Sequence, residues 1–123
     1  MPQLTVTTVN LGAPDAGALA RFYVRLLDWS LGRDEGDFVI IRNPAGGVSL
    51  AFQTEAHHVE PTWPSGPGDQ QMQLHLEIRV DDLESAVAHA VECGARVADF
   101  QPQDDVRVCL DPAGHPFCLW IDS

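Results

Sequence analysis

Two stretches of the chain show the same succession of hydrophobic and polar positions. Apolar and polar residues first alternate, at 8–13 and at 74–80, and this period of two is typical of a strand. Apolar residues then recur three and four positions apart, at 19–27 and at 83–91, which predicts an amphipathic helix after each strand. The two stretches align at an offset of 67 to 68 residues, so the chain contains an internal repeat.

Both predicted helices carry signals for their ends. Asp15 is expected to cap the first helix, and Asp81, with Glu84 three residues later, is expected to cap the second. Gly94 is predicted to end the second helix. Because each helix has one apolar face, we expect each to cover a sheet.

Short apolar runs that are typical of strands follow each helix. In the first half they lie at 37–42 and 48–53, and in the second half at 95–100, 106–110 and 117–121. In the strand at 48–53, alternation places Leu50 and Phe52 on the helix-covered face and Ser49, Ala51 and Gln53 on the opposite face.

A turn of similar composition precedes the last strand of each half. Asn43-Pro44-Ala45-Gly46 matches Asp111-Pro112-Ala113-Gly114, and proline and glycine supply the turn geometry in both. This match strengthens the interpretation of the two halves as copies of one unit.

The pattern therefore predicts an α+β protein built from two βαβββ modules, at about 3–54 and 74–122. The stretch 55–73, which holds prolines and glycines among polar residues, is interpreted as a linker. One module cannot bury both faces of its sheet, so we expect residues 1–123 to form a single domain with a shared core.

The charge balance excludes some classes of function. With 18 acidic and 7 basic residues the net charge is -11, and the arginines are scattered, so we expect no nucleic-acid partner. All the basic residues are arginine, which excludes a Schiff-base mechanism. No apolar run reaches the roughly 20 residues of a membrane span, and the first residues do not resemble a signal peptide. We expect a cytoplasmic protein that does not bind membranes.

Cys93, Cys109 and Cys118 are odd in number and far apart in the sequence. This spacing favours reduced thiols over a disulfide framework or a structural zinc site.

Three segments together resemble the vicinal oxygen chelate superfamily, and in particular its small glyoxalase-like domains. Ala20-Arg21-Phe22-Tyr23 and Leu26-Leu27-Asp28-Trp29 stand in the place of the family's FYxxLLGW helix. The second segment is Leu74–Leu83, and the third is Asp111–Phe117. The resemblance covers nearly the whole chain outside the linker.

The resemblance implies that the two modules form one open, barrel-like sheet with a cleft and a helix on the outside of each module. It also implies a homodimer. Metal-dependent members hold a divalent ion with four ligands, one from the first and one from the last strand of each module.

Carried over to this chain, the four ligand positions match at one place only. His75 lies seven residues before Asp82, as the family pattern has it. Thr8 takes the equivalent place in the first module, Cys118 takes the glutamate position of the second, and the fourth position falls on Leu50 or Ala51. We therefore expect no cofactor of the usual kind. A divalent metal held by His75 with Cys118, Glu77 or Gln53 stays open as an alternative.

His75 and Glu77 lie two positions apart on a strand and so share one face. They could act together in proton transfer, or His75 could only hydrogen-bond Glu77 or a backbone carbonyl. Cys118 has apolar neighbours, which favours a buried, inert thiol over a nucleophile. Trp120, and Trp63 if the linker folds over the cleft, offer flat apolar surface for a planar ligand.

Three functions follow from these observations. The first is a module that binds a small organic molecule, with a cleft lined by Thr8, Asn10, Gln53, His75, Glu77, Cys118 and Trp120. The second is a lyase or isomerase in which His75, with Glu77 or an ion, moves a proton next to a carbonyl. The third is a structural or regulatory domain without a ligand.

Overall fold

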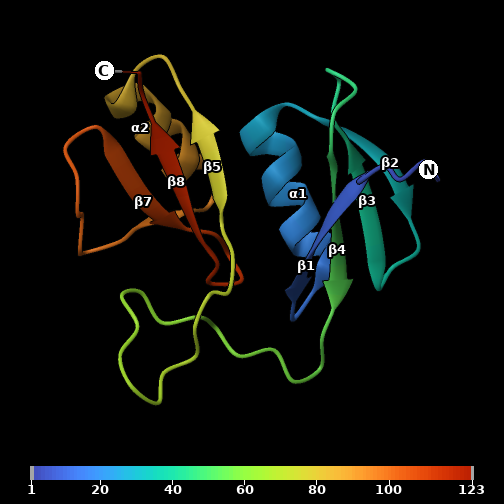
Figure 1. The fold of residues 1–123 in the computed structure, drawn as a ribbon, viewed down its shortest axis with the longest axis horizontal. Helices are drawn as coiled ribbons and strands as arrows, with labels where there is room; N and C mark the ends of the chain where they lie inside the picture. The colour runs from blue at the N-terminus through green and yellow to red at the C-terminus, as the bar shows by residue number, and fades with distance from the viewer. Residues whose placement is uncertain (1, 123) are drawn as a thin grey trace. The chain divides into compact units, whose positions relative to one another are not determined.

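Each half of the chain folds as a four-stranded mixed sheet with one helix, in a computed structural model that describes residues 2–122 (Figure 1). The chain divides into two compact units, Met1–His58 and Val59–Ser123. The first unit contains the elements β1 (Thr8–Ala13), α1 (Ala16–Leu27), β2 (Ser30–Asp34), β3 (Phe38–Arg42) and β4 (Ser49–Thr54). The second unit contains β5 (Leu76–Arg79), α2 (Leu83–Cys93), β6 (Arg96–Val97), β7 (Val106–Leu110) and β8 (Pro116–Trp120).

The two sheets have the same topology. The strand order is β1-β4-β3-β2 in the first and β5-β8-β7-β6 in the second, so the first strand of each unit pairs in parallel with the last. The remaining neighbours are antiparallel. The predicted α+β class and the repeat of two βαβββ modules are therefore confirmed.

The core of the first unit lies between α1 and one face of its sheet. Phe22 and Tyr23 of α1 are fully buried, and their rings meet edge to face with centroids 4.8 Å apart. Tyr23 also stacks on Phe52 of β4, with ring centroids 5.6 Å apart. The contact of Tyr23 with Phe52 therefore joins the apolar face of α1 to β4.

The second core is built from smaller side chains. Phe117 and Leu119 of β8 and Cys109 of β7 are buried, as are Ala90 and Cys93 on α2, which packs on these strands. By alternation, Cys118 and Val108 lie on the opposite face of the sheet, away from α2.

The caps of the helices follow the sequence signals with one correction. The Asp15 carboxylate accepts a hydrogen bond from Ala18 N–H at 3.2 Å, as predicted. The second cap is Asp82 rather than Asp81, because the backbone of Asp82 is extended and its carboxylate accepts a hydrogen bond from Ser85 N–H at 3.0 Å. Two residues earlier, Val80 N–H still donates to the carbonyl of Trp120 on β8. Gly94 ends α2 at a φ of 123°, as predicted.

The matched turns adopt the same structure. Ala45 N–H donates to Asn43 Oδ1 at 2.9 Å, and Ala113 N–H donates to Asp111 Oδ1 at 2.9 Å. In both turns the glycine has a positive φ, 82° at Gly46 and 87° at Gly114. The first residue of each turn therefore fixes it through its side chain, and the last supplies the left-handed conformation.

The structure differs from the predicted strands at two places. Strand β2 was not predicted: its five residues are all exposed, and it pairs with β3 through a bulge between Leu31 and Arg33. The run 95–100 is a strand only at Arg96–Val97. It stops there because the Gln101 side chain bonds to the carbonyls of Ala98 and Val108 and to Val108 N–H, in place of a longer ladder.

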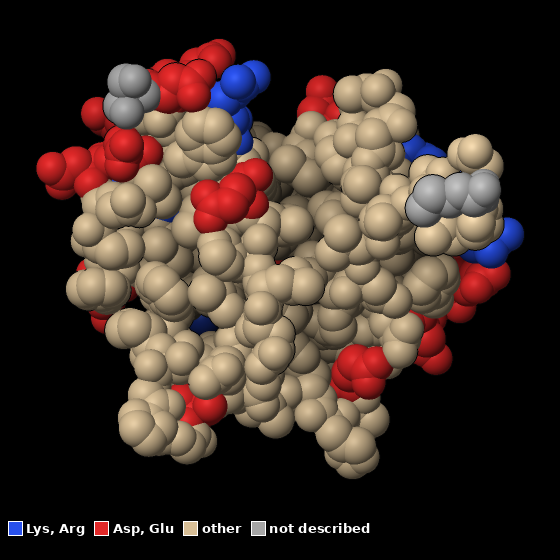
Figure 2. All heavy atoms as spheres, in the orientation of Figure 1, with Lys and Arg blue, Asp and Glu red and all other residues tan. Residues whose placement is uncertain are grey.

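Within the described residues no helix is long and apolar enough to cross a membrane. On the face drawn in Figure 2, acidic side chains outnumber basic ones, in line with the net charge of -11.

Candidate functional site

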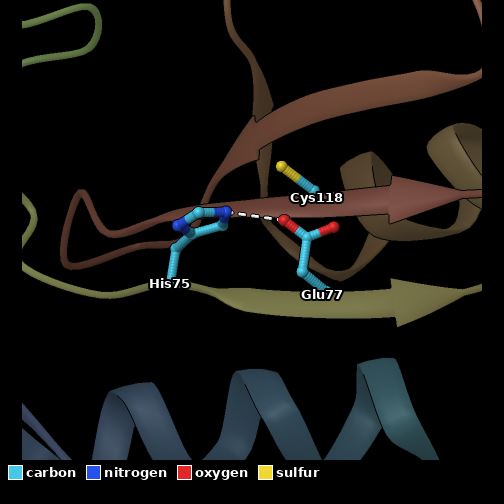
Figure 3. Close-up of side chains that lie close together, drawn as sticks. All are labelled: His75, Glu77 and Cys118. Carbon is cyan, nitrogen blue, oxygen red and sulfur yellow. Dashed lines mark hydrogen bonds and ion pairs between the residues drawn. The ribbon is translucent and has the colours of Figure 1, made fainter.

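Three side chains with metal-binding or acid–base chemistry meet on the second sheet. Figure 3 shows His75 just before β5, Glu77 on β5 and Cys118 on the neighbouring β8, because the strand expected at 74–80 begins only at Leu76. His75 Nε2 lies 2.6 Å from Glu77 Oε2, and Glu77 is the register partner of Cys118. One donor atom from each of the three residues lies within 4.8 Å of the others. The parallel pairing of β5 with β8 therefore builds the cluster.

An apolar cluster adjoins these groups. It consists of Ala98, Val108 and Cys118, with Trp63 and Val106 packed against it. Trp63 also lies beside Phe100, with ring centroids 6.5 Å apart. The linker thus carries Trp63 onto the same face of the second sheet that bears Cys118.

The indole N–H of Trp63 is the unusual polar group of this region. It is buried and, within residues 2–122, has no hydrogen-bond partner. A buried donor without a partner destabilises the folded state by roughly 1–3 kcal/mol, so a hydrogen bond from this N–H to a bound acceptor would be favourable.

Burial is the main reason why the Cys118 thiol stays protonated. Burial, the charge and hydrogen bond of Glu77 and the charge of Cys109 together raise the pKa of this thiol from 9.0 to about 12. At neutral pH the side chain is a thiol rather than a thiolate, and only the thiolate is a good nucleophile. This agrees with the interpretation of Cys118 as an unreactive thiol.

Cys109 allows a test of burial on the other side of the sheet. Burial raises the pKa of this thiol from 9.0 to about 11. Because the unfolded chain loses the proton first, the contribution of Cys109 to stability is present below pH 9.0 and is lost as the pH rises through about 11. We expect wild type to lose more stability than Cys109→Ala between about pH 8 and about pH 10.5, measured by urea unfolding. Equal losses in the two proteins would contradict this.

Trp120 lies on the same face as Cys118, two residues further along β8, and is half-buried. Its register partners are Arg79 on β5 and Val106 on β7. The structure therefore places Glu77, Cys118 and Trp120 on one face of the second sheet, and His75, just before β5, contacts Glu77 there.

In the first unit, the structure brings two of the three predicted residues together. Asn10 Nδ2 donates to Gln53 Oε1 at 3.2 Å, and Gln53 Nε2 donates to Glu55 Oε1 at 2.7 Å. With Gly12 these three residues line an open pocket of about 240 Å³. Thr8 lines a different depression, and its hydroxyl lies 3.2 Å from that of Thr7. That residues of both modules line one common cleft stays a prediction.

The comparison with protein families decides the classification. The model of a family described as "Glyoxalase-like domain" matches residues 7–120, nearly the whole chain. The chain belongs to this glyoxalase-like family. With it the chain joins the vicinal oxygen chelate superfamily, as the sequence motifs indicated. No curated protein sequence is similar enough to serve as a relative.

Solved structures with the same fold include three that differ in their described roles. A glyoxalase/bleomycin resistance protein/dioxygenase family enzyme from Burkholderia phytofirmans PsJN has a TM-score of 0.70 and 17% identity, over 96% of this chain and 98% of that chain. TnmS3, an antibiotic binding protein from Streptomyces sp. CB03234, has a TM-score of 0.65 and 22% identity, over 100% of this chain and 99% of that chain. Lactoylglutathione lyase from Agrobacterium tumefaciens has a TM-score of 0.63 and 15% identity, over 98% of this chain and 96% of that chain.

This glyoxalase-like domain does not fit the four-ligand metal site that the superfamily implies. The register resolves the fourth position as Ala51, because Asn10 pairs with Ala51 in the first unit as Glu77 pairs with Cys118 in the second. Alanine has no donor atom, and the hydroxyl of Thr8 is a poor ligand for a transition-metal ion. The first module therefore supplies neither of its two ligands.

Two residues of this glyoxalase-like domain gained their importance only from the structure. Trp63 was expected as a stacking surface, but nothing in the sequence indicated that its N–H would be buried and unpaired. Glu55, the first residue of the expected linker, accepts a hydrogen bond from the Gln53 amide. In the sequence, the only indication of this role is that an acidic residue follows the end of a strand.

Proposed function

We propose that this glyoxalase-like domain binds a small, planar organic molecule against the face of the second sheet that bears Cys118. The observation that carries the proposal is the unpartnered Trp63 indole N–H beside the apolar cluster of Ala98, Val108 and Cys118. An apolar surface with a few convergent polar groups is the usual composition of a ligand site.

The chemistry of the face selects the kind of ligand. The Trp63 and Trp120 rings and the apolar cluster favour an aromatic or otherwise flat molecule. The indole N–H favours a ligand with an acceptor such as a carbonyl oxygen. The carboxylate of Glu77 and the net charge of -11 disfavour an anion. A neutral aromatic carbonyl compound satisfies all three conditions.

Proteins with this fold support the proposal without naming the ligand. TnmS3 is described as an antibiotic binding protein, and the Agrobacterium tumefaciens protein as a lactoylglutathione lyase. The misfit of the four-ligand metal site favours the first of these two roles for the present chain.

A thermal-shift screen with neutral aromatic carbonyl compounds tests the proposal. A ligand at a hundred times its Kd stabilises the folded state by about 2.7 kcal/mol. Val106→Asp puts a charge beside the apolar cluster and should abolish the shift of any hit. Val97→Asp, at an exposed valine on the neighbouring β6, should leave the shift unchanged. A screen without hits, or a shift that survives Val106→Asp, would contradict the proposal.

A second candidate function rests on the 2.6 Å contact between His75 Nε2 and Glu77 Oε2. If His75 donates through Nε2, its Nδ1 carries the lone pair of a general base, and Glu77 fixes the ring and stabilises the protonated form. The domain would then be a lyase or isomerase that removes a proton next to a carbonyl. Solvent deuterium exchange into a bound carbonyl compound, lost in His75→Ala while binding persists, would support this candidate.

A further inference from the structure

We propose that the first module binds a short aliphatic carboxylic acid, as its anion, in a pocket between α1 and β2. The residues that line this pocket all belong to the first unit and lie on the side of its sheet that α1 covers. The ligand of the proposed function binds the second sheet instead. The two inferences are therefore independent.

The pocket exists because α1 covers the middle of the first sheet and not its edge. Tyr23 of α1 stacks on Phe52 of β4, a central strand, whereas β2 lies at the edge of the sheet. The space beside β2 has a volume of about 300 Å³. Sites for small molecules usually measure roughly 300–1,000 Å³, so this pocket suits a ligand of modest size.

The apolar part of the lining is aliphatic. It consists of Ala20, Val24, Leu31 and Val39. Ala20 and Val39 are buried within the fold, but the side chain of Leu31 is 56% exposed. An aliphatic body in the pocket would cover Leu31 and remove its surface from water, which is favourable.

Two cations, Arg21 and Arg25, line the same pocket. They stand four positions apart on α1 and are exposed. Like charges at this spacing repel each other and destabilise a helix, and an anion bound between them would relieve the repulsion. Among residues 2–122, no carboxylate forms a salt bridge with Arg21. An added carboxylate can take this place, because the planar guanidinium group binds a carboxylate through two parallel hydrogen bonds.

The acidic groups nearby do not cancel these two charges. Asp34 lines the pocket, and its carboxylate accepts a hydrogen bond from Gly36 N–H at 2.9 Å. The Asp15 carboxylate lies near Gly17 and caps the helix through Ala18 N–H. Both carboxylates thus hold backbone turns. Among the described lining residues there are two guanidinium groups and one carboxylate, in a chain whose net charge is -11.

The second module repeats the groove without the pair of cations. With the caps of the two helices aligned, at an offset of 67 residues, Ala88 takes the place of Arg21. In the same alignment an acidic residue, Glu92, replaces Arg25. The groove of the second module, about 400 Å³, is lined by Leu83, Glu84, Val87, Val97 and Arg107. Its one cation, Arg107, donates to the backbone carbonyls of Gln103, Asp104 and Val106. This groove therefore serves as an internal control for the shape of the pocket without its charge.

Titration of ¹⁵N-labelled protein with hexanoate tests the proposal at the level of single residues. An aliphatic probe avoids the second sheet, where the proposed ligand is aromatic. We expect saturable shifts of the backbone amide signals of Gly17, Arg21 and Leu31, and none at Val87 and Val97 in the groove of the second module. Hexanamide, which has the same shape without the charge, should bind at least tenfold more weakly.

Four variants at exposed positions separate the contributions of charge and apolar surface. Arg21→Gln and Arg25→Gln should each weaken the binding of hexanoate about tenfold, because each removes a charged hydrogen-bond donor. Leu31→Asp puts a carboxylate into the apolar part of the lining and should abolish binding. Arg33→Gln is the matched control, since Arg33 lies on β2 beside Glu35, 3.8 Å away, and does not line the pocket.

The absence of saturable shifts with hexanoate would overturn the proposal, as would hexanamide that binds as tightly as hexanoate. Equal losses in Arg33→Gln and Arg21→Gln would also contradict it. Inorganic phosphate is the probe for an anion without an apolar body. If phosphate binds as tightly as hexanoate, the site holds bare anions and the proposal fails. Val106→Asp, which should abolish ligand binding at the second sheet, should leave hexanoate binding unchanged, so the two proposals can fail separately.

Discussion

Phe52→Ala will lower the free energy of unfolding by about 3–5 kcal/mol, the usual loss when a fully buried phenylalanine is truncated. Phe52 is 0% exposed and stacks on Tyr23 of α1, so alanine leaves a cavity under the helix and removes an aromatic pair. Urea unfolding followed by circular dichroism measures the change. Leu4→Ala, at a leucine that is 85% exposed, should change the stability by less than about 0.5 kcal/mol.

The same experiment tests whether the two modules form a single domain. If they share one core, as the sequence predicts, Phe52→Ala will move one cooperative transition, seen alike by circular dichroism and by the fluorescence of Trp63 and Trp120 in the second unit. If the units fold independently, the variant will unfold in two steps, and tryptophan fluorescence from the second unit will keep its wild-type midpoint. A loss of less than about 1 kcal/mol would contradict the assignment of Phe52 to the core.

Trp63→Ala will weaken the binding of a neutral aromatic carbonyl ligand by about 30-fold, which corresponds to about 2 kcal/mol for a buried tryptophan at the centre of a site. Trp63→Phe keeps much of the apolar contact and removes only the donor. It should therefore weaken binding by about 3- to 10-fold, the worth of one hydrogen bond. Fluorescence or calorimetric titration measures both losses.

Trp29→Phe is the matched control, because Trp29 follows α1 in the first unit and is not part of the proposed site. It should leave the affinity within experimental error of wild type. Equal losses in Trp63→Phe and Trp29→Phe would mean that the ligand does not use the Trp63 N–H. Melting temperatures of all three variants separate a loss of binding from a loss of fold.

The fold could be predicted from the sequence because its strands and helices carry strong periodic patterns. The alternation at 8–13, the helical spacing at 19–27 and the repeated turn at Asn43 and Asp111 all agree with the structure. Strand β2 could not be predicted because its residues are all exposed, so it has no apolar face. The early end of β6 could not be predicted because the Gln101 side chain competes for the backbone partners of the strand.

The candidate site was predictable where it depends on strand geometry. That His75 and Glu77 share a face follows from alternation, and the structure adds the parallel register that sets Cys118 opposite Glu77. Trp63 was named only on the condition that the linker folds over the cleft. The path of a segment without regular structure depends on tertiary contacts, here with Val108 and Cys118, which no local pattern encodes.

Binding of a small organic molecule at the Trp63 N–H can be observed directly through the indole N–H resonances of ¹⁵N-labelled protein. Trp63→Phe identifies the resonance of Trp63 among those of the tryptophans. On titration with hits from the ligand screen, we expect a saturable shift of the Trp63 resonance, because its N–H gains an acceptor, and little change at Trp29. Saturable binding that leaves the Trp63 resonance in place, or that moves only Trp29, would contradict it.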